Sequence, residues 1–290
     1  MGDILFVPGF FRATPSTSFF DGKNSLDGIF NWNSWARADA GKIPVPDTDD
    51  TTYHSAAKSS NKLFMMGISP LQFKHIDGGQ NWYVRGEDNL ELRFNQVLAL
   101  QPDMIELQTW NDAGEGHYMG NIWSEPIQNS PIPAYTDGFD HKGYWQVLPA
   151  FIQAWKAGST TASEMTPTNG KDFQGVLWHH TLTVDADCSS DALGKPRDIG
   201  NAEDVVSGIV LVAKGKSGLS LSVRNGSKEL GQLVLVGGYN KFKFGGLGAG
   251  KVEAEIRDEG AAVASISGPL EVASSASLCN YNFQVVGFPS

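Results

Sequence analysis

A change of pattern near the middle of the chain is the feature that most limits how it can fold. Before residue 160, short apolar runs alternate with amphipathic or loop segments. Residues 87–103 lie between two such runs and have the spacing of an amphipathic helix. The apolar face of this helix consists of Leu90, Phe94, Val97 and Leu98. A helix that connects two strands is typical of a parallel sheet, so we expect an α/β region over residues 1–160.

A Ser/Thr-rich stretch separates this region from six short β-rich runs with turn glycines between them. Alternation of apolar and polar residues over such runs predicts antiparallel strands, and their regular spacing is typical of a β-sandwich. We therefore expect a linker over residues 161–172 and a β-sandwich over residues 173–290.

Charge and hydropathy argue against two classes of partner. The formal net charge is -10, from 22 Lys plus Arg against 32 Asp plus Glu, and no long basic run is present, so nucleic acid is not expected. No apolar stretch approaches the ~18 residues of a membrane helix, so no membrane partner is expected. The first residues, MGDILFVPGFF, also lack the basic and long apolar parts of a secretory signal peptide.

Cys188 and Cys279 are the only cysteines. They are either two buried free thiols or one disulfide, and the sequence leaves both readings open. A disulfide across a loop of that length would stabilise the fold by roughly 4 to 5 kcal/mol on the chain-entropy model. Asn225, followed by Gly226 and Ser227, forms the one N-glycosylation sequon and is a candidate for glycosylation.

Four apolar runs in the first half are expected to begin as strands and to end in polar or aromatic residues: 4–11, 28–35, 63–70 and 104–112. In a (β/α)-barrel, reacting groups gather at the carboxyl ends of the strands, which fits this pattern. Aromatic rings beside polar residues also suit the stacking of sugar rings. Asn31 and Trp32 belong either to a core strand or to such a sugar platform.

The stretch TWNDAGEGHY, residues 109–118, carries two acids three positions apart. Asp112 and Glu115 form either a helix capping box or a carboxylate pair for glycosidic hydrolysis. Glycines within and just after the stretch would cost roughly 1 kcal/mol at each interior position of a helix, so a loop is expected. Its candidates for binding sugar are Trp110, Asn111, His117 and Tyr118.

Other motifs do not predict a cofactor. Residues 245–251 imitate a phosphate-binding loop, but Val252 stands where Ser or Thr would hold magnesium. No metal is expected either, because no paired Cys or Glu at ligand spacing accompanies His54, His75, His141, His179 or His180.

Four segments carry a resemblance to a known family: residues 27–39, 62–73, 81–120 and 141–158. They resemble the second half of the catalytic domain of glycoside hydrolase family 71, the fungal α-1,3-glucanases or mutanases. The resemblance covers about residues 6–158, and the β-rich tail resembles the C-terminal β-sandwich of that family. The family motif WND-x-GE places its carboxylate pair at Asp112 and Glu115. Inverting hydrolysis in the family implies that Glu115 is the acid and Asp112 the base.

The resemblance also implies an incomplete barrel. A (β/α)8-type barrel takes about 250 residues, and only about 160 precede the linker. We therefore expect an N-terminally truncated barrel, with about half present, followed by an antiparallel β-sandwich. The open sheet edges of half a barrel would favour self-association.

The function implied is that of a fungal, secreted, endo-acting glycosidase that cleaves α-1,3-glucan without a cofactor, outside the cell or in its wall. The alternative is a truncated remnant without activity that binds glucan in the cell wall.

Overall fold

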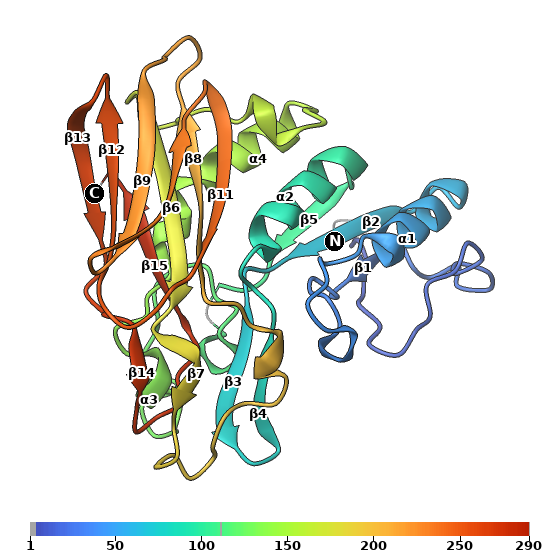
Figure 1. Ribbon diagram of the computed structural model, residues 1–290. Helices are drawn as coiled ribbons and strands as arrows, with labels where there is room; N and C mark the ends of the chain where they lie inside the picture. The colour runs from blue at the N-terminus through green and yellow to red at the C-terminus, as the bar shows by residue number, and fades with distance from the viewer. Residues whose placement is uncertain (1–3, 111, 290) are drawn as a thin grey trace.

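The computed structural model describes residues 4–110 and 112–289. Its first half contains a three-stranded parallel sheet with the order β1-β2-β5, and helices α1 and α2 lie in the two connections (Figure 1). The elements are β1 (Gly28–Asn31), η1 (Ala38–Ala40), α1 (Thr48–Ser59), β2 (Leu63–Ile68), α2 (Asn89–Leu100) and β5 (Met104–Leu107). The helix and parallel pairing predicted around residues 87–103 are confirmed.

Helix α2 forms because its apolar residues recur on one face, and that face packs into the core. Leu90, Phe94 and Val97 are fully buried. Phe94 stacks on Phe151 of helix α4 (Leu148–Lys156), with 4.1 Å between the ring centroids. Pro102 follows the helix and prevents its continuation.

A β-hairpin is inserted between β2 and α2. It consists of β3 (Gln72–Asp77) and β4 (Gln80–Val84), joined at Gly78 and Gly79. The loop of residues 188–198 runs beside β4, and Arg197 forms a bridge with Trp82. The hairpin therefore joins the first half of the chain to the second.

Short helical segments separated by loops lie along the path from β5 to the second half. They are η2 (Ala113–Glu115), α3 (Pro133–Thr136), η3 (Lys142–Gln146), α4 and η4 (Ala162–Glu164).

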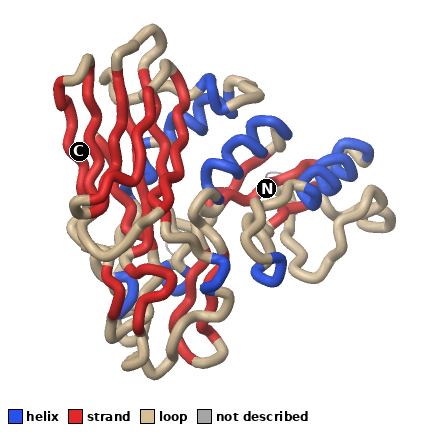
Figure 2. Tube along the Cα trace, in the orientation of Figure 1, coloured by secondary structure: helices blue, strands red, loops and turns tan. Residues whose placement is uncertain are grey.

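The second half is an all-β region of two four-stranded antiparallel sheets, and strands dominate this part of Figure 2. One sheet contains β10 (Lys228–Val234), β9 (Leu219–Asn225), β12 (Val252–Asp258) and β13 (Ala261–Ser267). The other contains β11 (Gly238–Gly245), β8 (Val205–Val212), β6 (Phe173–His180) and β15 (Phe283–Phe288). Their facing apolar residues form one core cluster. Strands β7 (Leu182–Asp187) and β14 (Ala273–Ser275) pair in parallel beside them, and η5 (Ile199–Asn201) follows the loop after β7.

The parallel sheet of the first half is open, and one expectation about its strands needs correction. Within residues 4–110 and 112–289 the parallel sheet has three strands and does not close into a barrel. Residues 4–11 form no strand apart from a single bridge between Gly9 and Phe30. The carbonyls of Phe6 and Pro8 accept hydrogen bonds from the backbone N–H groups of Asp27 and Phe30. Pro8 has no N–H to donate in return, and the side chains of Ile4 and Leu5 are exposed, so the pairing does not extend into a strand.

The cysteines and the sequon lie in the second half. Cys188 and Cys279 are joined in a disulfide. Asn225 is buried at the end of β9, and its Oδ1 accepts a hydrogen bond from the Gly248 backbone N–H (2.7 Å). A glycan would attach to the side-chain nitrogen, which is also buried. This placement argues against the predicted glycosylation of Asn225.

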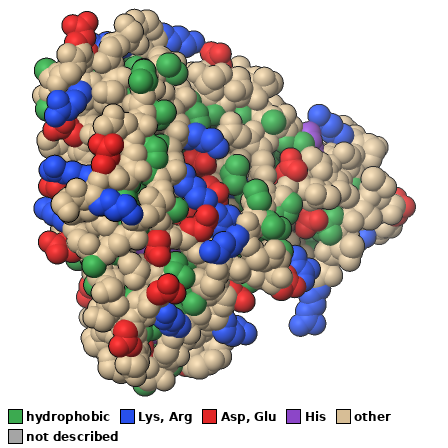
Figure 3. All heavy atoms as spheres, viewed as in Figure 1, with side chains coloured by type: hydrophobic (Ala, Val, Ile, Leu, Met, Phe, Trp, Pro, Cys, Tyr) green, Lys and Arg blue, Asp and Glu red, His purple; other side chains and the backbone are tan. Residues whose placement is uncertain are grey.

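The two halves share one apolar core. A single cluster of buried residues includes Phe64 and Phe94 from the first half and Trp178, Tyr281 and Phe283 from the second. Basic and acidic side chains gather along the junction on the face shown in Figure 3. Lys243 contacts both Asp88 (3.1 Å) and Glu203 (2.5 Å) at this junction. In the part of the chain that the structure describes, no helix has the length and apolar character needed to cross a membrane.

Candidate active site

The site lies at the carboxyl edge of the three parallel strands. Because parallel strands end at the same edge of a sheet, the segments that follow β1 and β5 meet there. Trp32 and Trp35 follow β1, and residues 112–117 follow β5. The two tryptophan rings meet His117 edge-on, with centroid separations of 5.8 and 5.4 Å.

Asp112 and Glu115 belong to a loop rather than to a helix start. Only one 3-10 turn, η2, follows Asp112, and the Asp112 side chain caps no backbone N–H. The capping-box reading is therefore wrong for the folded chain. The two side chains are partly exposed, Asp112 at 43% and Glu115 at 25%, so both carboxylates remain accessible.

His117 lies between the two carboxylates. Its Nε2 is 3.4 Å from Oδ2 of Asp112 and 3.4 Å from Oε2 of Glu115, and its side chain is fully buried. Burial lowers the pKa of His117, but the two acidic neighbours outweigh burial and raise the pKa above its usual value. The two acids therefore favour the protonated, positively charged form of the imidazole between them.

Glu115 also receives hydrogen bonds from strand β3. Gln72 Nε2 donates to Oε2 (2.8 Å), and Lys74 Nζ donates to Oε1 (3.0 Å). Together with His117, these donors lower the pKa of Glu115 to about 2 although burial opposes them. Glu115 is therefore ionised in the unliganded protein at any ordinary pH.

Asp112, Glu115 and His117 also offer three ligand atoms within 4.8 Å of one another, which is metal-ligand spacing. The ammonium group of Lys74 already contacts Glu115, and its charge would repel a cation. The arrangement therefore suits proton transfer better than metal binding.

Two residues predicted to bind sugar have other roles. Asn31 is buried, and its Nδ2 donates to Asp50 (2.7 Å), which pairs with buried Arg93. Tyr118 is buried, and its hydroxyl donates to the Phe139 carbonyl (2.5 Å). Both side chains already have their polar partners, which corrects the prediction that they contact substrate.

The other predicted residues fall at or near the site. Trp32 is half-buried. Trp110 is 61% exposed, and in the sequence it stands shortly before Asp112. The side chain of His117 is buried, and it contacts the two carboxylates rather than solvent. Asn111 lies outside the described residues.

The sequence reasoning did not identify Gln72, Lys74 and Trp35. The run QFKHID alternates polar and apolar residues before Gly78-Gly79, which is a hairpin signal. That signal predicts that Gln72 and Lys74 share one face of a strand, but it does not say what that face meets.

A carboxylate pair at the carboxyl edge of parallel strands, with aromatic rings beside it, is an arrangement typical of glycoside hydrolases. Comparison with known protein families identifies the particular glycoside hydrolase family. The chain belongs to glycosyl hydrolase family 71, whose family model matches residues 1–290.

Similar proteins in this family are fungal. The chain is 30% identical over 287 residues to the glucan endo-1,3-alpha-glucosidase of Schizosaccharomyces pombe, covering 96% of this chain and 61% of that protein. It is 28% identical over 269 residues to the ascus wall endo-1,3-alpha-glucanase of the same yeast, covering 89% and 59%. It is 30% identical over 267 residues to a mutanase of Penicillium rubens, covering 90% and 56%.

The chain thus spans about 60% of the length of these relatives. No solved structure matches it significantly.

Proposed function

We propose that this chain hydrolyses α-1,3-glucan within the polysaccharide, with Asp112 and Glu115 as the reacting carboxylates. The observation that carries the proposal is this accessible pair, held around His117 in a chain of family 71. The names of the relatives, two endo-1,3-alpha-glucanases and a mutanase, support the linkage and the internal attack.

The chemistry requires two carboxyl groups in different protonation states. One donates a proton to the glycosidic oxygen while the bond from C1 to that oxygen breaks. The other accepts a proton from the water molecule whose oxygen bonds to C1. One water is consumed, and two chain ends are produced.

The role of each carboxylate is open to experiment. Resemblance to the family implies that Glu115 is the acid and Asp112 the base. The hydrogen bonds from Gln72 and Lys74 stabilise the Glu115 carboxylate, so an acid role requires these contacts to change when sugar binds.

Inversion also requires space for the water molecule. Carboxyl groups of inverting enzymes lie roughly 6.5–9.5 Å apart, whereas one oxygen of Asp112 lies within 4.8 Å of one oxygen of Glu115. We therefore propose that sugar binding separates the pair if hydrolysis inverts the anomeric carbon.

We propose Trp32 and Trp110 as the surfaces on which sugar rings stack. Exposed Phe11 lies 6.3 Å from Trp32 between ring centroids and extends the apolar surface beside the site. Aromatic faces of this kind suit the C–H faces of glucose units.

For the architecture, we propose that β1, α1, β2, α2 and β5 are consecutive units of a (β/α)8-type barrel. Their parallel order, their crossover helices and the position of the site support this. We also propose a barrel domain over residues 1–160, a linker over 161–172 and a β-sandwich domain over 173–290.

We propose an extracellular or cell-wall location with α-1,3-glucan as the partner. The disulfide is typical of oxidising compartments, and one relative is named for the ascus wall. The half-exposed edge strand β5 is our proposed surface for self-association.

The test is to incubate the purified chain with insoluble α-1,3-glucan, α-1,4-glucan and β-1,3-glucan and to measure reducing ends. We expect release of oligosaccharides from α-1,3-glucan alone, and nuclear magnetic resonance of the first product identifies its anomer. Comparable release from α-1,4-glucan would contradict the proposed substrate.

A further inference from the structure

The hairpin of β3 and β4 has two functional faces. Alternate residues of a strand point to opposite sides. Gln72 and Lys74 on one side donate to Glu115, while His75 on the other side is buried against the all-β region. The hairpin thus lies between the carboxylate pair and the second half of the chain.

The backbone of β3 also contacts the turn that carries Glu115. Gly116 has φ of +72°, and a Cβ at this position would lie 3.0 Å from the Phe73 carbonyl oxygen. The turn therefore rests directly on β3, and a shift of β3 would move Glu115 through both backbone and side-chain contacts.

Asp191 fixes the other side of the hairpin. His75 Nε2 lies 2.8 Å from Asp191 Oδ2, and the same oxygen accepts a hydrogen bond from the Cys279 backbone N–H (2.7 Å). Asp191 Oδ1 accepts from the Leu193 N–H (2.8 Å). One buried carboxylate thus joins β3, the loop of residues 188–198 and the cysteine that closes the disulfide.

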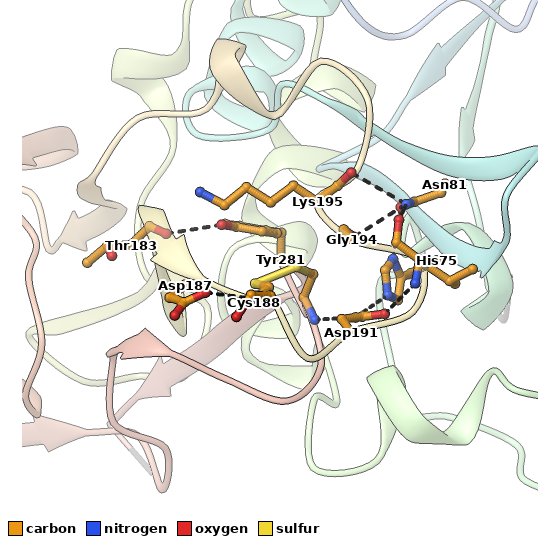
Figure 4. The surroundings of a disulfide bond; sticks show 12 residues. His75, Asn81, Thr183, Asp187, Cys188, Asp191, Gly194, Lys195 and Tyr281 are labelled. Atoms are coloured by element: carbon orange, nitrogen blue, oxygen red, sulfur yellow. Dashed lines mark hydrogen bonds and ion pairs between the residues drawn. A yellow bond between two sulfur atoms is a disulfide. The ribbon is translucent and has the colours of Figure 1, made fainter.

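Figure 4 shows Asp191 between the disulfide and His75. The disulfide joins the start of the loop, Cys188, to Cys279, and both of these residues are buried. Further along, Asn81 Nδ2 donates to the Leu193 carbonyl (3.0 Å), and the backbones of Tyr83 and Arg197 are hydrogen-bonded (2.9 Å). The loop is therefore fixed at one end by a covalent bond and along its length by β4.

We propose that Asp191 and the disulfide-closed loop are positioning elements for Glu115, acting through His75 and strand β3. The catalytic consequence of this inference rests on the proposed function. The inference also gives the all-β region a role in positioning Glu115. None of these residues contacts the carboxylate itself, so each acts through the hairpin.

The decisive variant is Asp191→Asn, which removes the charge that holds His75 and the Cys279 N–H. Its matched control is Asp187→Asn, because Asp187 lies near the same loop, is exposed, and bonds through its side chain only to the neighbouring Ser189 among the described residues (2.9 Å to the Ser189 N–H). We expect Asp191→Asn to lower kcat/KM on α-1,3-glucan by about 10- to 100-fold, since displacement of a reacting group by about 1 Å costs about 100-fold. The control is expected to keep the activity of the unaltered chain.

Two readouts separate positioning from general destabilisation. In a plot of kcat/KM against pH, one limb reports the titration of Glu115. We expect this limb to move to higher pH in Asp191→Asn, because a weaker contact with Lys74 raises the pKa of Glu115 from its value of about 2. Hydrogen-deuterium exchange should become faster in residues 109–118, although these lie outside the substituted loop. A lower melting temperature with an unmoved limb and unchanged exchange at 109–118 would overturn the proposal.

If Asp191→Asn does not fold, the double variant Cys188→Ser with Cys279→Ser receives the same measurements, and unchanged exchange at residues 109–118 would again overturn the proposal. The exchange readout needs no activity. A chain that cleaves no glucan, but whose variants loosen residues 109–118, would reject the proposed function and keep the positioning role.

Discussion

At the residue scale, His117 sets the charge balance of the site. It is fully buried, and it contacts both carboxylates at the same distance. A buried imidazole without acidic neighbours would lose its proton readily, as the lowered pKa of buried His179, about 4, illustrates. At His117 the acids reverse that effect, so the protonated ring can hold two like charges close together.

We predict that His117→Gln lowers kcat/KM by about 10- to 100-fold, because the carboxylates lose the group that positions them. It should also change how stability depends on pH. The folded-state pKa of His117 is raised, so its stabilising contribution is complete below about pH 6.5 and is lost as pH rises through the raised pKa. The gap in melting temperature between the unaltered chain and the variant should therefore narrow toward alkaline pH.

His54→Gln is the control, since His54 is also buried but lies on α1 with a lowered pKa. If the difference in melting temperature between the unaltered chain and His117→Gln instead grows as pH rises, the positive charge assigned to His117 is wrong.

Residue types alone predicted the carboxylates but not which neighbours face them. His117 and Tyr118 are adjacent and equally suited to sugar, yet one contacts Asp112 and the other bonds the Phe139 carbonyl. Asn31 pairs with Asp50, 19 positions away in the chain. Such choices depend on tertiary contacts, which a local pattern does not contain.

At the element scale, strand β3 and turn η2 depend on their close approach at Gly116. We predict that Gly116→Ala destabilises the fold more than Gly138→Ala. Both glycines have positive φ, which costs roughly 1–2 kcal/mol for a residue with a Cβ. Only Gly116 lacks space, since a Cβ at Gly138 would meet nothing within 4 Å.

Urea unfolding of both variants measures the difference in free energy, and glucan hydrolysis measures its effect on Glu115. Equal destabilisation by the two substitutions would mean that the contact with Phe73 is unimportant.

The elements with a strong period were predictable, and the inserted ones were not. Helix α2 shows its apolar face in the sequence, and the strands of the all-β region show their alternation. The apolar run at residues 4–11 resembles a strand in composition, but Pro8 and its exposure prevent one. The β3–β4 hairpin is inserted between strand β2 and helix α2, so a prediction of a simple strand-helix-strand unit does not include it.

At the scale of the whole molecule, the two halves depend on each other. Trp178 of β6 donates from Nε1 to the Glu87 carbonyl (3.1 Å), and Tyr83 of β4 bonds His180 (2.9 Å). Together with the shared apolar cluster, these contacts predict a single cooperative unfolding transition. Calorimetry that resolved two transitions would instead favour independent domains on either side of residues 161–172.

The central claim is that Asp112 and Glu115 carry out hydrolysis, and the most direct measurement is reducing-end release from insoluble α-1,3-glucan by Asp112→Asn and Glu115→Gln. The exposed acids of the same connecting segment provide matched controls, Asp137→Asn and Glu125→Gln. We predict that each site variant loses at least about 100-fold in rate, as expected for a lost acid or base, while both controls keep the rate of the unaltered chain. A folded chain that sediments with the glucan but releases no reducing ends, or a site variant that retains full activity, would contradict the account.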